Sequence, residues 1–129
     1  MAQLPRLKRR QEFLAVAASG RKFVAPGLIL QACRHAAKDE RRADEGEAGE
    51  ALDLRVGFTA SRKVGNAVER NRARRRLKAA SEAVLREHGT PGYDYVVVAR
   101  AGTLTRDYAD LLADLAAGLK HLKLYRTRH

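Results

Sequence analysis

The spacing of apolar and polar residues divides the chain into segments with a helical period and segments with the period of a strand. Leu111, Leu115 and Leu119 recur on one face of a helix, whereas every second residue from Leu54 to Ala60 is apolar. Pro26-Gly27 and Thr90-Pro91-Gly92 interrupt the pattern as turns do. The pattern predicts helices over 6–19, 67–88 and 106–122, and strands over 22–34, 54–61 and 93–100.

The order of these segments predicts an α+β fold in one domain, since 129 residues suffice for one modest core. A strand, a long helix and a second strand follow one another from residue 54 to residue 100, which is typical of a parallel strand pair. From the residues alone, a right-handed crossover is expected.

Composition adds a strong positive charge. The chain has 26 Lys and Arg against 15 Asp and Glu, a net charge of +11, and a pI near 10.5. Nucleic acid, an anionic membrane surface and an acidic protein are the partners that fit such a charge. We see no apolar run long enough to cross a membrane and no apolar core of a signal peptide. With a single cysteine, Cys33, the sequence predicts a cytoplasmic, nucleic-acid-binding protein.

The charge is concentrated between Arg55 and Lys78, where nine basic residues accompany a single acid, Glu69. Asn66 precedes the helix and Glu69 follows three residues later, which predicts a capping box. The positions that face the core are Ala73, Leu77, Ala80 and Val84, and Arg72, Arg75 and Lys78 project from the opposite side. Like charges at these spacings destabilise a helix, and Arg forks match phosphate oxygens, so the pattern favours binding to a polyanion.

The segment SRKVGNAVERNRARRRLKAA, with Arg70-Asn71-Arg72 at its centre, resembles the signature of the bacterial ribonuclease P protein component. The resemblance extends to RLKRRQEF before it and YDYVVVAR after it. It implies a small mixed sheet packed with three helices, like the second domain of ribosomal protein S5, with a left-handed βαβ crossover.

The resemblance also implies a function. The family binds the catalytic RNA subunit of ribonuclease P, the endoribonuclease that removes the 5′ leader from precursor tRNA. The RNA carries out the Mg²⁺-dependent hydrolysis, and the protein holds no cofactor tightly. By matching position, the contacts with the RNA subunit are Lys63, Asn66, Arg70, Asn71, Arg72, Arg74, Arg75 and Arg76. The expected contacts with the leader are Phe13, Leu28, Arg55 and Tyr125.

The chain departs from the family pattern where the leader is expected to bind. Many members carry a second aromatic one turn after Phe13, and this chain has Ala17 there. Leu28 and Gln31 occupy strand positions that are often aromatic. We therefore expect the leader to be held by shape and backbone contacts more than by stacking on rings. Packing in the core is an alternative role for Phe13.

Other interpretations stay open at this stage. A ribosomal or other structural RNA-binding protein shares the size, charge and Arg-rich helix, and a metal-dependent nuclease acting alone is a third possibility. The scattered histidines are expected at the surface, and Cys33 is expected to be a small buried residue. The carboxylates of Asp107, Asp110 and Asp114 are expected to form a solvated face. The acidic segment 38–53 is expected to be a solvated loop, with mimicry of RNA as the alternative.

Overall fold

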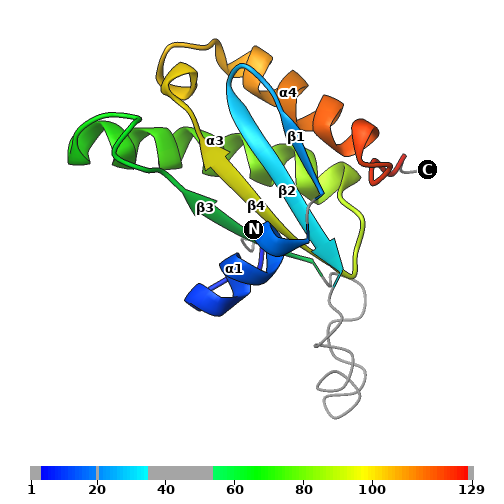
Figure 1. Cartoon of the computed structure of the whole chain (residues 1–129). Coiled ribbons are helices and arrows are strands. Elements are labelled where there is room, and N and C mark those ends of the chain that lie inside the picture. Colours follow the sequence, from blue (N-terminus) through cyan, green and yellow to red (C-terminus); the bar gives the residue numbers. More distant parts are fainter. Residues whose placement is uncertain (1–3, 20, 35–53, 128–129) are drawn as a thin grey trace.

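A four-stranded sheet with helices on both faces organises the chain in the computed structural model, which describes residues 4–19, 21–34 and 54–127 (Figure 1). The helices are α1 (Arg10–Ala18), α3 (Ala67–His88) and α4 (Tyr108–His121), with a short 3₁₀ helix η1 (Ala101–Leu104) before α4. The strands are β1 (Lys22–Val24), β2 (Leu28–Arg34), β3 (Arg55–Thr59) and β4 (Tyr93–Ala99). Their spatial order is β1-β2-β4-β3.

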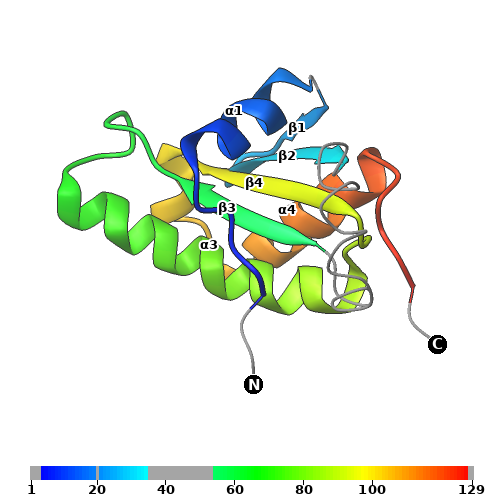
Figure 2. The same cartoon turned by 90° about the horizontal axis from the view of Figure 1, so that it is seen from below.

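The two faces of the sheet are covered unequally. α1 lies alone on one face, and α3 and α4 lie on the other, as Figure 2 shows. In β2, Leu28, Leu30 and Ala32 are fully buried in the cluster that α3 and α4 close. The residues between them face α1 and are only half-buried. The α3–α4 side therefore holds the main core, and the α1 side stays partly open.

The strand pairing confirms the expected mixed sheet. β2 pairs antiparallel with both β1 and β4, and β3 pairs parallel with β4. In Figure 1, β3 and β4 point the same way, and α3 crosses behind the sheet on the way from one to the other. This is the left-handed sense, which the resemblance implied and the general preference for right-handed crossovers did not.

The first helix is shorter than predicted because residues 5–7 pair with the edge of β3 instead of forming its first turn. The amide of Leu7 donates to the carbonyl of Val56 at 3.0 Å, and the amide of Val56 donates to the carbonyl of Pro5 at 3.0 Å. Residues 5–7 thus run along the outer edge of β3 in extended conformation, and α1 begins at Arg10. This pairing also covers a strand edge that is otherwise open to other chains.

Two other predicted boundaries change. The segment 22–34 is a hairpin of two strands, because the bend at Pro26-Gly27 turns β1 back onto β2. The last helix begins at Tyr108 rather than at residue 106, and η1 lies between β4 and this helix. The helix predicted over 67–88 matches α3 at both ends.

The solvated carboxylate face predicted for the last helix is wrong at Asp114, which is buried with 6% exposure. Its carboxylate accepts from Arg106 Nε at 2.7 Å and Nη2 at 3.0 Å, and from the amide of Gly27 at 3.1 Å. Asp107 and Asp110 are exposed as expected. Cys33 is half-buried rather than buried. The acidic segment 38–53 lies outside the described residues.

Candidate nucleic-acid interface

The start of α3 is fixed by a complete capping box. Asn66 Oδ1 accepts from the amide of Glu69 at 2.8 Å, and Glu69 Oε1 accepts from the amide of Asn66 at 2.8 Å. Gly65 precedes them with φ of 152°, and a β-carbon there would lie 2.1 Å from Glu69 Oε1. A glycine at this turn therefore permits the capping carboxylate to fold back over the helix end.

The face of α3 toward the sheet is apolar, as predicted: Ala73, Leu77 and Ala80 have 0% exposure and Val84 has 7%. Arg72 and Arg75 are exposed on the other side, and Arg70 and Arg74 are half-exposed. Lys63 is exposed in the loop before the helix, next to Arg62, which the sequence reasoning missed. We call this set the basic surface: Arg62, Lys63, Arg70, Arg72, Arg74 and Arg75.

No carboxylate of the described residues forms a salt bridge with the basic surface. Among the described residues, the salt bridges join Arg55 to Glu12 and to Asp94, Arg86 to Glu82, and Arg106 to Asp114. Within the basic surface, Arg70 donates to the carbonyl of Gly65 at 3.0 Å and Arg74 to Asn71 Oδ1 at 2.7 Å, both neutral acceptors. Within the described part of the chain, these charges therefore have no anionic partner.

Arg76 differs from its neighbours, because its guanidinium is occupied by the protein itself. Nη1 donates to the carbonyls of Thr103 at 2.7 Å and Leu104 at 3.0 Å, and Nη2 donates to that of Arg106 at 2.6 Å. Arg76 therefore fastens α3 to η1 and to the start of α4. The resemblance placed it with the RNA contacts, but the geometry gives it a structural role.

The four residues expected to contact the leader are divided between the two faces of the sheet. Phe13 and Arg55 lie on the α1 side. Leu28 is fully buried in the main core, so its expected contact with the leader is a wrong prediction. The period of two in β2 turns Leu28 away from α1 and turns the half-buried Ile29 and Gln31 toward it.

Tyr125 does not join Phe13. It packs against the main core, its ring stacks on His88 with centroids 4.3 Å apart, and Lys120 Nζ lies 4.8 Å from the ring centroid. For Leu28, the sequence did contain a signal of its burial. Leu28 and Gln31 are three positions apart in β2, so their side chains face opposite sides of the sheet and cannot both face α1.

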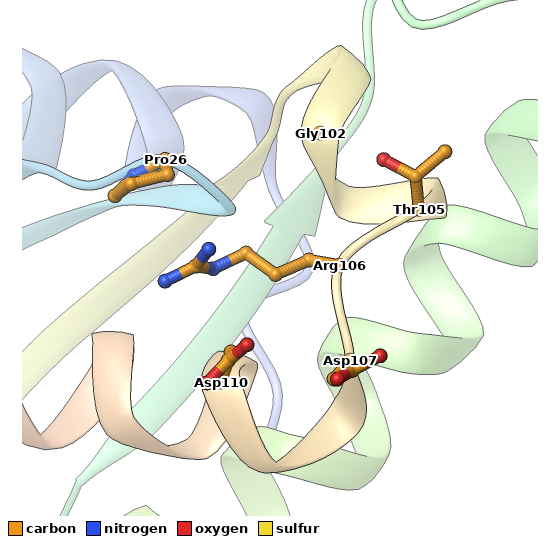
Figure 3. Close-up of a pocket in the computed structure, with 6 residues that line it drawn as sticks. All are labelled: Pro26, Gly102, Thr105, Arg106, Asp107 and Asp110. Carbon is orange, nitrogen blue, oxygen red and sulfur yellow. The ribbon is translucent and has the colours of Figure 1, made fainter.

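An open hollow of about 370 Å³ lies where η1 meets α4, lined by Pro26, Gly102, Thr105, Arg106, Asp107 and Asp110 (Figure 3). Arg106 is already paired with Asp114, so the remaining charge of the lining is negative and unsuited to phosphate. Among the described residues, no group of three or more His, Cys, Asp or Glu side chains is arranged to hold a metal ion. No helix in that part of the chain is long and apolar enough to cross a bilayer.

A small α+β scaffold with a row of arginines on one helix, which no carboxylate of the described residues neutralises, is typical of nucleic-acid-binding proteins. Within that class the chain belongs to the ribonuclease P protein family, whose model matches residues 1–123. The chain is 50% identical over 128 residues to the ribonuclease P protein component of Paramagnetospirillum magneticum, covering 99% of this chain and 90% of the relative. It is 45% identical over 115 residues to that of Gluconacetobacter diazotrophicus, covering 89% and 88%.

Solved structures agree on the fold. The RNase P protein of Staphylococcus aureus matches with a TM-score of 0.69 at 22% identity, covering 96% of this chain and 100% of that one. The RNase P protein of Thermotoga maritima matches with a TM-score of 0.62 at 22% identity, covering 92% and 94%. Membership of this family supports a role in tRNA processing and sets aside the ribosomal interpretation.

Proposed function

We propose that the protein binds the catalytic RNA subunit of ribonuclease P through the basic surface, in the cytoplasm, and assists removal of the 5′ leader from precursor tRNA. The observation that carries this proposal is the row of arginines on the first half of α3, which no carboxylate of the described residues neutralises. Arginine forks are suited to phosphate oxygens. The RNA subunit supplies the Mg²⁺-dependent hydrolysis.

A second part of the proposal concerns the leader. The single-stranded leader lies on the α1 side of the sheet, against Phe13 and the half-buried Ile29 and Gln31. Phe13 is half-buried, so part of its ring is available for a base to stack on. The neighbouring surface is aliphatic or polar, which favours contact by shape over a series of stacked rings.

The test removes charge from the basic surface and measures assembly as a function of salt. Changing Arg70 and Arg72 together to Ala removes two phosphate partners, so we expect weaker binding to the RNA subunit. The steepness of the decrease in log affinity with log salt should fall by roughly 1.4 to 1.8. Binding is measured by filter retention or fluorescence anisotropy from low to physiological salt.

A charge-matched control is Lys123→Ala with Arg126→Ala, beyond α4. Arg126 bonds through its amide to the carbonyl of His88, at the far end of α3 and roughly 25 Å along the helix from Asn71. This control should leave the slope almost unchanged. Equal slopes for the two double variants would refute the assignment of the basic surface. Cleavage of precursor tRNA by the protein without any RNA subunit would refute the division of labour.

A further inference from the structure

Arg55 occupies the centre of a three-residue charge cluster between α1 and the sheet. Its Nη1 donates to Glu12 Oε2 at 2.9 Å, and its Nε and Nη2 donate to Asp94 Oδ1 and Oδ2 at 2.9 and 2.7 Å. Glu12 belongs to α1, Arg55 to β3 and Asp94 to β4. We name this cluster the α1 clamp.

The α1 clamp is poorly suited to binding the leader directly. Two carboxylates surround the Arg55 guanidinium, so its charge is already matched by anionic groups of the protein. The Arg55 side chain is also only 17% exposed, and its planar fork is already matched by the carboxylate of Asp94. This geometry favours a role for Arg55 other than the direct leader contact that the family resemblance implied.

The residue next to Glu12 makes an equally specific contact with the same strand. The ring of Phe13 lies on the backbone of Gly57, where a β-carbon would come within 2.5 Å of Phe13 Cε2 and 2.6 Å of Cζ. Gly57 follows Arg55 by two positions and so shares its face of β3. Glu12 and Phe13 thus engage two successive positions on one face of the strand.

Other contacts hold α1 against β2 and β4. Val16 is the buried residue of α1, in a small cluster with Leu7 and Val96, and Ser19 Oγ donates to the carbonyl of Ala32 at 2.9 Å. Glu12 uses its other oxygen to accept from the amides of Lys8 and Arg9. One carboxylate therefore joins the helix start, the segment before it and the sheet.

From these contacts we infer that Arg55 is a positioning residue, which ties α1 to β3 through Glu12 so that Phe13 is presented to the leader of precursor tRNA. The inference rests on the proposed leader surface. It predicts that Arg55 acts on the leader only through Phe13 and not through its own charge.

The test is a double-variant cycle in the assembled holoenzyme, with Phe13→Ala, Arg55→Met and both together. The measurement is the KM for precursor tRNA with its leader and for a substrate whose leader is cut to one nucleotide. Phe13→Ala should reduce the leader-dependent gain in affinity, measured as the ratio of the two KM values, by about 5- to 150-fold, the range for one stacked base. Arg55→Met should reduce the same leader-dependent affinity by a smaller factor. The double variant should show no greater reduction than Phe13→Ala alone.

Other readouts separate positioning from simple loss of structure. Arg55→Lys keeps one ion pair at a time and should recover part of the lost affinity, and Arg55→Met should leave the salt slope for the leader unchanged. Glu12→Gln cuts the link to α1 while leaving the Arg55–Asp94 pair, so it should reproduce Arg55→Met even if that variant folds poorly. Arg86→Met, which removes a salt-bridged arginine from the far half of α3, is the control without effect on the leader.

The outcomes are distinct. If Phe13→Ala leaves discrimination of the leader unchanged, the proposed leader surface fails and the positioning role fails with it. Two other results would overturn the positioning role alone, given that Phe13→Ala acts as expected. One is a double variant in which the two losses of leader-dependent affinity add in full, and the other is an Arg55→Met variant that loses no such affinity. A salt slope that falls by about 0.7 in Arg55→Met would instead make Arg55 a direct phosphate contact.

Discussion

Arg75 and Arg76 are neighbours in the basic segment between Arg55 and Lys78, but the structure predicts that they have different roles. Loss of Arg76 should lower stability, whereas loss of Arg75 should weaken RNA binding. Arg76→Met removes three hydrogen bonds from a charged donor to backbone carbonyls of η1 and the residues after it. Each such bond contributes roughly 1.5–3 kcal/mol, and water can replace part of it at a half-exposed site. We therefore expect the free energy of unfolding to fall by about 2–4 kcal/mol, against a total of roughly 5–15 kcal/mol for a domain.

The assay is urea unfolding followed by circular dichroism, together with binding to the RNA subunit at several salt concentrations. With a slope of roughly 2 kcal/mol per molar urea, the midpoint should fall by about 1–2 M in Arg76→Met. Arg75→Met is the matched control on the exposed face. Its midpoint should shift by less than about 0.3 M, and its salt slope should fall by about 0.7 to 0.9.

The opposite pattern would refute this reasoning. An unchanged midpoint in Arg76→Met, with a salt slope lowered by about one, would mean that the Arg76 guanidinium leaves its carbonyls and binds RNA. The two arginines would then be equivalent, as the sequence alone suggested.

Two further predictions concern the ends of helices. Asn66→Ala removes the cap of α3 and should lower the free energy of unfolding by about 1 kcal/mol, whereas Asn66→Asp should keep it; the urea midpoint measures both. Burial raises the pKa of Glu12, but the amides of Arg9 and Lys8 and the guanidinium of Arg55 outweigh it and lower the pKa to about 2. The stability from ionised Glu12 is therefore complete above about pH 4.5 and lost as pH falls toward 2. The urea midpoint of Glu12→Gln should therefore decrease less than that of the parent protein as pH falls from about 4.5 to 2. Parallel decreases in the two proteins would contradict this prediction.

The sequence by itself determined those features that depend on local periodicity and local charge. The limits of α3, its capping box and its apolar stripe follow from residues within a few positions of one another. The basic segment likewise stands out without reference to any other part of the chain. The alternation from Leu54 to Ala60 correctly places Val56 and Phe58 on the buried face of β3.

Only the tertiary structure decided which of these charges are free. Arg76 meets its carbonyl acceptors 27 to 30 residues along the chain, and Arg55 meets Asp94 39 residues along. An arginine in a basic segment has the same local signature whether it faces solvent or a distant carbonyl, so no spacing rule separates the two cases. The start of α1 and the burial of Leu28 were decided in the same way, because each depends on which remote strand or helix covers that face.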